Sequence, residues 1–270
     1  MHYSARPASH DLSDDFVTSE RFALRGQTAL VTGASSGLGR HIACVLARAG
    51  ARVVITARRL DRLKTLEEEL GGTAAVPMIL ELDLRQKEMI APAIARVVST
   101  VGPIDILVNN AGYAISKPSL QQTWEDWSAV VETNLVSAWL MSQAVAAHMV
   151  QAGHGVILNV ASILGLRGIG GLAPYIASKH GVVGLTKGLA IDLARYHIRV
   201  NALAPGYFAT DLNADFLASP QGLDLCRRVP LRRFGEMTDL DGPVLLLVSD
   251  AGRYLTGVVL PVDGGHTMSV

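Results

Sequence analysis

Short apolar runs alternate with longer amphipathic ones along the chain from Gln27 onward. The short runs have the length of strands, and the longer ones have the 3.6-residue period of helices. The strand segments are almost wholly apolar, which is typical of a parallel sheet that is buried on both faces. The pattern predicts an α/β fold: a single-domain, Rossmann-type, doubly wound parallel sheet of about seven strands with helices on both faces.

The same alternation sets the expected element boundaries. Strands are expected at residues 28–32, 51–56, 75–82, 104–109, 155–160, 198–204 and 257–263. Helices are expected at residues 40–50, 61–70, 86–101, 123–149, 175–196 and 239–250. Residues 1–25 are polar and have no period, so they are interpreted as a flexible N-terminal extension. Residues 26–270 then form one domain, in which about 207–233 make up a substrate loop.

Charge and cysteine content narrow the range of partners. The chain has 24 basic and 24 acidic residues and a pI of about 7.1, so it lacks the positive surface needed to bind nucleic acid or an anionic membrane. No run of about 18 apolar residues indicates a membrane span. Cys44 and Cys226 lie far apart in the sequence and predict neither a disulfide framework nor a metal site. We expect a cytoplasmic protein with a small-molecule substrate.

A glycine-rich turn follows the first predicted strand. Residues 32–39 read T-G-A-S-S-G-L-G, and the next helix opens there. Glycines let the backbone turn tightly and approach a pyrophosphate, whose charge is stabilised by the free N–H groups of the helix N-terminus. Glycine also occurs in turns that bind nothing, but the position after the first strand favours a dinucleotide site. The predicted cofactor contacts are Gly33, Ser35, Ser36, Gly37, Leu38 and Gly39.

The end of the second strand indicates which dinucleotide is bound. An NAD site places an acidic residue about 20 residues beyond the glycines, against the ribose 2′-hydroxyl. This chain has Ala57, Arg58 and Arg59 there, and a guanidinium suits a 2′-phosphate. The alternative is a pair of solvated arginines that contact Asp61 or Glu67. We take Arg58 as the phosphate ligand and expect NADP(H) to be preferred, with NAD(H) usable.

Two more strand ends are expected to border the cofactor. The third strand ends in Asp83 and Leu84, and the fourth is followed by Asn110, Ala111 and Gly112. Ligands of doubly wound sheets lie at the carboxyl ends of the strands, which places both segments at the same edge. Either segment alone is also consistent with an ordinary turn.

Three polar residues near the fifth strand suggest acid/base chemistry. Ser162 follows the strand, Tyr175 comes 13 residues later, and Lys179 lies one helical turn beyond Tyr175 on the same face. A tyrosine with a pKa near 10 exchanges protons poorly at neutral pH unless a nearby cation stabilises its phenolate. Lys179 and the charge of an oxidised nicotinamide would lower the pKa of Tyr175. The alternative is a packed ring beside a solvated lysine.

Together these motifs resemble those of the short-chain dehydrogenase/reductase family. The resemblance extends from about Phe22 to the C-terminus, and five motifs occur in the order that is typical of the family. The matching residues are 32–39, 109–112, Asn134 in the segment TNLVSAW, Ser162 with the Y-x-x-x-K pair Tyr175 and Lys179, and Pro205, Gly206 and Thr210 of P-G-x-x-x-T.

The resemblance implies roles for these residues. Tyr175 would be the acid/base, Ser162 would polarise the substrate, and Lys179 would also bind the nicotinamide ribose. Asn134 would hold a water that relays protons to Lys179, and Thr210 would contact the carboxamide. The cofactor contacts would also include Pro205, Gly206, Tyr175 and Lys179. A homotetramer is the expected assembly.

The substrate is less closely defined than the reaction. The resemblance implies interconversion of a secondary alcohol and a ketone, and it is strongest to gluconate 5-dehydrogenases, which act on a keto-sugar acid, and to 3-oxoacyl-acyl-carrier-protein reductases, which act on a thioester. A catalytically silent NADP-binding regulator is the alternative from another class. Arginines near the expected pocket are compatible with a carboxylate or phosphate on the substrate, or with plain solvation: Arg167, Arg227, Arg228, Arg232 and Arg233.

Overall fold

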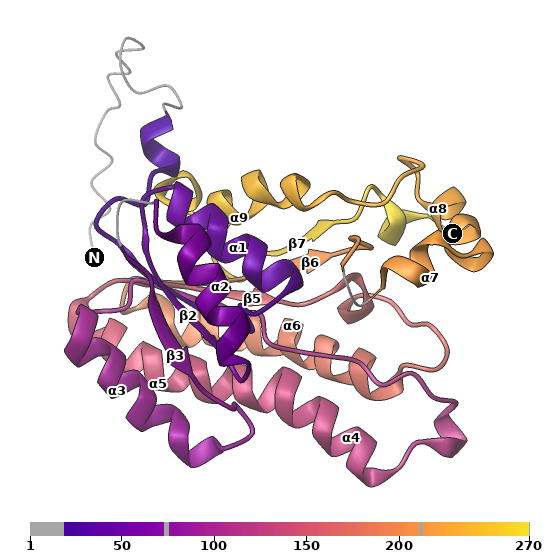
Figure 1. The fold of residues 1–270 in the computed structure, drawn as a ribbon, viewed down its shortest axis with the longest axis horizontal. Coiled ribbons are helices and arrows are strands. Elements are labelled where there is room, and N and C mark those ends of the chain that lie inside the picture. The colour runs from indigo at the N-terminus through magenta and orange to yellow at the C-terminus, as the bar shows by residue number, and fades with distance from the viewer. Residues whose placement is uncertain (1–18, 73–75, 211–212, 270) are drawn as a thin grey trace, which may run out of the picture.

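A single parallel sheet organises the protein (Figure 1). The structure, a computed structural model, describes residues 19–72, 76–210 and 213–269. Within these residues the strand order is β3-β2-β1-β4-β5-β6-β7, so the chain runs outward from β1 in both directions and the predicted doubly wound sheet is confirmed. The strands are β1 (Thr28–Thr32), β2 (Arg52–Ala57), β3 (Met78–Glu81), β4 (Ile106–Asn109), β5 (Gly155–Val160), β6 (Ile198–Pro205) and β7 (Val259–Val262).

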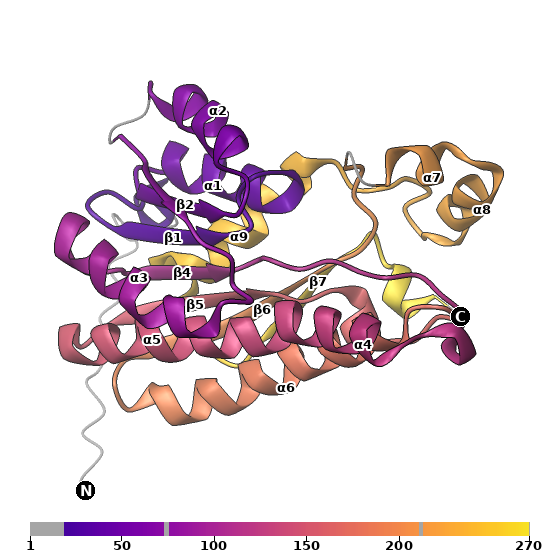
Figure 2. The same cartoon turned by 60° about the horizontal axis from the view of Figure 1, so that its bottom comes forward.

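Helices cover both faces of the sheet, as the two views in Figures 1 and 2 show. One face is covered by α1 (Gly37–Arg48), α2 (Leu60–Leu70) and α9 (Asp241–Val248). The other is covered by α3 (Lys87–Val101), α4 (Trp124–Val131), α5 (Ser137–Ala152) and α6 (Ala173–Ala194). Successive strand residues point to opposite faces, so Ala29 and Val31 pack under α1 while Leu30 packs toward α3 and α5.

Two regions differ from the elements predicted from the sequence. The expected helix over residues 123–149 is two helices, because a π-helical turn at Glu132–Val136 separates α4 from α5. The substrate loop contains α7 (Ala214–Ala218) and α8 (Pro220–Arg228). The start of α8 has a local cause, since the Ser219 hydroxyl accepts a hydrogen bond from the Gly222 N–H and Pro220 occupies the first turn.

The domain begins earlier than the expected boundary at residue 26. Ser19–Phe22 forms a 3-10 helix, and Leu24 is fully buried in the apolar layer beneath α1. The Leu24 N–H also donates to the Ala49 carbonyl at 2.8 Å. This part of the predicted extension is therefore packed, because a single buried leucine anchors it to the end of α1. Residues 1–18 lie outside the described residues.

Candidate active site

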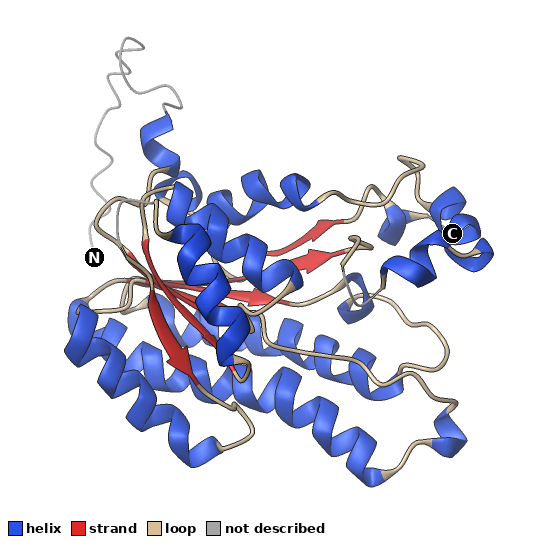
Figure 3. Cartoon of the chain, viewed as in Figure 1, coloured by secondary structure: helices blue, strands red, loops and turns tan. Residues whose placement is uncertain are grey.

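The predicted site residues gather at one edge of the sheet, where the parallel strands end. The arrows of β6 and β7 point toward the end of the molecule that carries α7 and α8 (Figure 3). The loops after β1 to β6 leave from this edge, and every candidate residue except Asn134, Tyr175 and Lys179 lies on or beside them. Those three come from helical segments that pack under the same edge.

The glycine turn after β1 leaves the first turn of α1 free to bind an anion. Gly33 and Gly37 adopt positive φ angles of 68° and 55°, which favour glycine. Ser36 precedes α1 without capping it through its side chain, and the first turn carries no acidic residue. A Cβ on Gly39 would overlap the Asn110 amide and the Gly33 carbonyl. These residues fit a dinucleotide pyrophosphate, which needs unpaired N–H groups and close backbone approach.

Asn110 fastens this turn to the end of β4. Its backbone N–H donates to Thr32 Oγ1 at 2.9 Å, and its side-chain Nδ2 donates to the Thr32 carbonyl at 2.9 Å. The Ala111 N–H donates to the same hydroxyl at 3.1 Å. The Asn110 side chain, predicted as a cofactor contact, is thus committed to positioning the turn. Gly112 lies against Asn134 and Lys179, where a Cβ would come within 3.0 Å and 3.5 Å of their polar atoms.

The structure places Arg59, rather than the selected Arg58, over the phosphate turn. Arg59 Nη2 donates to both the Ser35 and the Ser36 hydroxyls at 3.0 Å. Arg58 lies instead on the side of Asp83, a carboxyl whose pKa is lowered mainly by hydrogen bonds from Arg85, with a smaller contribution from the charge of Arg58. The sequence made both arginines candidates for the 2′-phosphate ligand. Only the path of the chain after β2 distinguishes between them.

The segment after β3 borders the site in part. Asp83 forms a close pair with Arg85, whose Nη2 lies 2.6 Å from Asp83 Oδ2. The Leu84 side chain is buried in the layer that contains α3, so only its backbone faces the cofactor edge.

Ser162, Tyr175 and Lys179 come together as predicted. Ser162 Oγ accepts a hydrogen bond from the Leu164 N–H at 3.1 Å, which orients the hydroxyl at the end of β5. Lys179 Nζ lies 5.7 Å from the centre of the Tyr175 ring and donates to the Val160 carbonyl at 2.7 Å. The lysine is almost fully buried, and burial lowers the pKa of its ammonium to about 8.

The pKa of Tyr175 shifts in the direction opposite to the one expected from Lys179. Burial of the phenol raises its pKa, and a hydrogen bond with Ser162 opposes that rise. The charge of Tyr207 adds to the rise in the pKa of Tyr175. The phenol therefore carries its proton at neutral pH.

Asn134 is held by the π-helical turn and a ring of hydrogen bonds. Its Nδ2 donates to the Tyr113 carbonyl at 2.9 Å and to Ser178 Oγ at 3.0 Å, and its Oδ1 accepts from the Tyr113 N–H at 3.0 Å. Ser178 donates in turn to the Tyr175 carbonyl at 2.7 Å. Ser178 is not predicted from the sequence, although its place one residue before Lys179, on a buried helix face, is a signal. Both N–H groups of the Asn134 side chain are used. Only its side-chain and backbone carbonyl oxygens therefore remain to accept a hydrogen bond from a water.

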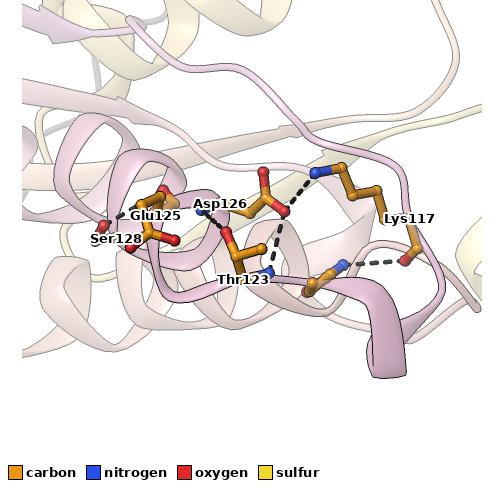
Figure 4. A network of polar contacts seen from close by, with 6 residues as sticks. Lys117, Thr123, Glu125, Asp126 and Ser128 are labelled. Atoms are coloured by element: carbon orange, nitrogen blue, oxygen red, sulfur yellow. Dashed lines mark hydrogen bonds and ion pairs between the residues drawn. The ribbon is translucent and has the colours of Figure 1, made fainter.

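The loop between β4 and α4, here called the wall loop, carries Tyr113, the backbone partner of Asn134, and is held by a network of polar contacts (Figure 4). Lys117 Nζ lies 2.6 Å from Asp126 Oδ2, and the Lys117 N–H donates to the Gly171 carbonyl at 3.0 Å. Thr123 and Asp126 form a reciprocal capping box at the start of α4. These contacts hold the wall loop against the start of α4 and against Gly171, which lies in the segment that leads to Tyr175.

The residues after β6 complete the edge. The Gly206 N–H donates to the Val262 carbonyl at 2.9 Å, and a Cβ on Gly206 would lie 2.8 Å from Asp263. Pro205 closes the strand. A Cβ on Gly37 would lie 3.6 Å from the Thr210 side chain, so Thr210 sits across from the phosphate turn. The position fits a contact with a bound dinucleotide.

Within residues 19–72, 76–210 and 213–269, no group of three or more His, Cys, Asp or Glu side chains is placed to hold a metal ion. Among the same residues, no helix combines the length and the apolar character required to span a membrane.

Comparison with known proteins identifies the family. A family model described as Enoyl-(Acyl carrier protein) reductase matches residues 33–267. A gluconate 5-dehydrogenase of Gluconobacter oxydans is 38% identical over 250 residues, covering 92% of this chain and 98% of that protein. A 3-oxoacyl-[acyl-carrier-protein] reductase of Staphylococcus epidermidis is 37% identical over 243 residues, covering 90% and 99%.

A solved structure agrees with these relatives. The gluconate 5-dehydrogenase from Burkholderia cenocepacia J2315, in complex with NADP and tartrate, has a TM-score of 0.90 and 39% identity to this chain, covering 93% of this chain and 99% of that one. The chain therefore belongs to the short-chain dehydrogenase/reductase family and is an NAD(P)-dependent oxidoreductase that acts on a CH–OH or keto group.

Proposed function

We propose that this protein interconverts a keto-sugar acid and the matching secondary alcohol with NADP(H). The observation that carries the proposal is the convergence of Ser162, Tyr175 and Lys179 beside a glycine turn that fits a dinucleotide. Loss of Tyr175 or Lys179 would have indicated a silent cofactor-binding regulator, and both are present and correctly grouped.

Each side chain has a chemical task in ketone reduction. NADPH, when bound, supplies the hydride. Ser162 uses its hydroxyl proton to bind the carbonyl oxygen, since its own oxygen already accepts from Leu164. Tyr175, protonated at neutral pH because burial raises its pKa, gives its proton to that oxygen as negative charge develops. Lys179 and Asn134 then return a proton to Tyr175, Lys179 through its ammonium and Asn134 by holding a water.

NADP(H) is the proposed cofactor because a guanidinium lies where a 2′-phosphate would bind. The Arg59 guanidinium bridges two serine hydroxyls of the phosphate turn, and these three groups form a donor set suited to a phosphate oxygen. Arg58 lies nearby on the same connection and adds positive charge. The relative from Burkholderia cenocepacia holds NADP in its crystal structure.

A sugar acid is the first choice of substrate, and a 3-oxoacyl thioester is the second. The gluconate 5-dehydrogenases of Gluconobacter and Burkholderia favour the first, and the latter was crystallised with tartrate, a hydroxy diacid. The Staphylococcus reductase favours the second at 37% identity. The positive charge of Arg167, which forms no ion pair with any described residue, adds weight to the sugar acid.

We also propose that the chain acts as a cytoplasmic homotetramer. The helices α4 and α5 expose large apolar side chains, Trp124, Trp127 and Trp139, with 72%, 38% and 44% of their surface accessible. Such a surface is typical of a subunit contact. Both cysteines, Cys44 and Cys226, are free thiols, which suits a reducing compartment.

Replacement of Tyr175 by Phe tests the proposed mechanism. The variant deletes the donated proton and little else, so turnover of 5-keto-D-gluconate should fall by about a thousandfold or more while NADPH still binds. Absorbance of NADPH at saturating substrate measures turnover, and NADPH fluorescence measures binding. Wild-type turnover in Tyr175→Phe would overturn the assignment of the acid.

A further inference from the structure

Five arginines near the substrate loop differ in how their charges are used. Arg227 pairs with Asp224 at 2.8 Å, and Arg233 pairs with Asp239 at 2.6 Å. Arg232 folds back onto the Arg227 carbonyl. Arg167, Arg228 and Arg232 form no ion pair with any residue that the structure describes. Of these three cations, Arg167 is the one in the loop between Ser162 and Tyr175.

Arg167 lies in the loop that joins the two reacting residues. It follows Ser162 by five positions, and its N–H donates to the Ile163 carbonyl at 3.0 Å, which holds its backbone close to the end of β5. Its guanidinium Nη1 donates to the His266 carbonyl at 2.8 Å. Its Nη2 and Nε make no hydrogen bond with any other described residue. One nitrogen of the guanidinium, Nη1, is thus bound to His266. The N–H groups of the other two nitrogens are not used by any described residue.

Aromatic contacts connect this corner to the reacting centre. The Tyr207 ring packs edge-on against His266, with ring centres 5.6 Å apart. Tyr207 follows Gly206 just after β6, and β6 pairs with β5, the strand that leads to Ser162. The charge of Tyr207 raises the pKa of Tyr175, and the Arg167 guanidinium lowers the pKa of Tyr207 against the larger effect of burial. Arg167 is thus joined through His266 to Tyr207, which follows the strand next to the one that leads to Ser162.

The two acids that line this corner with Tyr207, Asp239 and Asp263, are already engaged, Asp239 by its ion pair with Arg233. Asp263 accepts hydrogen bonds from the Gly265 N–H and from the Thr267 N–H and hydroxyl, and so shapes the turn that carries His266. His266 is nearly fully buried, and its Nδ1 has no partner among the described residues. The positive charges of Arg167 and Arg228 both lower the pKa of His266, so positive charge exceeds negative charge around this ring.

The geometry points to Arg167 as the residue that binds a carboxylate of the substrate, with the Tyr207 hydroxyl binding a neighbouring hydroxyl group. The unused fork of Arg167 offers paired N–H groups that match the two carboxylate oxygens. The ligand class is a short oxo or hydroxy acid whose carboxylate lies a few carbons from the reacting carbon. This inference rests on the proposed function, since it assigns a specificity residue to the same site.

The test compares two ketones that differ only in charge. One is 5-keto-D-gluconate, and the other is the neutral ketose in which a hydroxymethyl group replaces the carboxylate. The variant Arg167→Met should lower kcat/KM for the acid by about tenfold to a hundredfold, chiefly through KM, because a charge-assisted bond is lost. It should change kcat/KM for the neutral ketose by less than about twofold.

Matched variants separate binding from structure. Arg227→Gln removes the same charge from an arginine that is already paired, so the preference for the acid should stay at the wild-type value. Arg167→Lys keeps a cation but loses the fork, and should recover part of the preference. NADPH binding, measured by fluorescence, checks that each variant is folded.

The outcomes distinguish the two proposals. If the wild-type enzyme reduces neither ketone with NADPH, the proposed function fails and this inference fails with it. If the wild-type enzyme is active but shows no preference for the acid, or if Arg167→Met lowers both activities equally, Arg167 is only a structural anchor of His266 and the proposed function stands.

Discussion

Lys179 brings a positive charge into the protein interior, where it hydrogen-bonds the Val160 carbonyl and has no carboxylate partner among the described residues. Burial lowers its pKa from an ordinary 10.5 to about 8. The unfolded chain keeps the ordinary value, so the folded state holds this proton less tightly. The resulting loss of stability is fully present below pH 8, shrinks as the pH rises from 8 to 10.5, and is absent above that range.

Replacement of Lys179 by Met should therefore stabilise the protein while abolishing turnover. A neutral side chain of similar length removes the buried charge but also the bond to Val160, for a net gain of about 2 kcal/mol at pH 7. Urea unfolding at pH 7 and at pH 10 measures the gain at both values. A gain that is the same at both would mean that the buried charge is not its source.

Arg58 and Arg59 should differ in their effect on cofactor preference. Because Arg59 bridges the two serine hydroxyls, Arg59→Ala should raise KM for NADPH by about tenfold to a hundredfold and leave KM for NADH nearly unchanged. Arg58→Ala serves as the matched control, with an effect of no more than about threefold. Initial rates with each cofactor measure this. A larger effect at Arg58 would mean that binding rearranges the connection after β2.

At the scale of elements, α4 is the helix whose start matters most to the site. Its first turn is held by Thr123 and Asp126, and Asp126 also pairs with Lys117 in the wall loop (Figure 4). The π-helical turn at its end then directs Asn134 toward Ser178. One helix thus holds the wall loop at its beginning and leads to the Asn134 amide at its end.

Replacement of Thr123 by Ala should loosen this helix start. The hydroxyl accepts from the Asp126 N–H at 3.2 Å, and the loss of such a cap costs about 1 kcal/mol. The melting temperature should fall by about 2–4 °C, measured by differential scanning fluorimetry. Thr123→Ser keeps the cap and is expected to melt near the wild-type temperature. If the Ser variant fell as far as the Ala variant, the methyl group rather than the cap would be responsible.

For the whole molecule, the apolar side chains on α4 and α5 predict the assembly. If four copies associate through these helices, light scattering after size-exclusion chromatography should give four times the chain mass of 28.7 kDa. Trp139→Glu places a charge on this surface and should yield a smaller species. A monomeric wild type would mean that the exposed tryptophans serve another contact.

Much of the fold followed from the sequence because the signals were local. The strands β1 and β5 begin and end where their apolar runs do, and the glycine turn lies directly after β1. The order of motifs was enough to group Ser162, Tyr175 and Lys179, since parallel strands end at one edge. Local patterns were less reliable where helix type changes, as at the π-helical turn, because a period of 3.6 does not register one wider turn.

Other features depend on contacts between segments far apart in the chain. Short patterns in the sequence were enough to predict the doubly wound sheet, the glycine turn and the candidate reacting residues, because each pattern involves a few neighbouring residues. Folding fixed three further features: Arg59 rather than Arg58 meets the phosphate turn, Leu24 belongs to the core, and Arg167 keeps an unpaired charge. These features depend on burial and on partners far away in the chain, such as the His266 carbonyl 99 residues from Arg167, which no local pattern specifies.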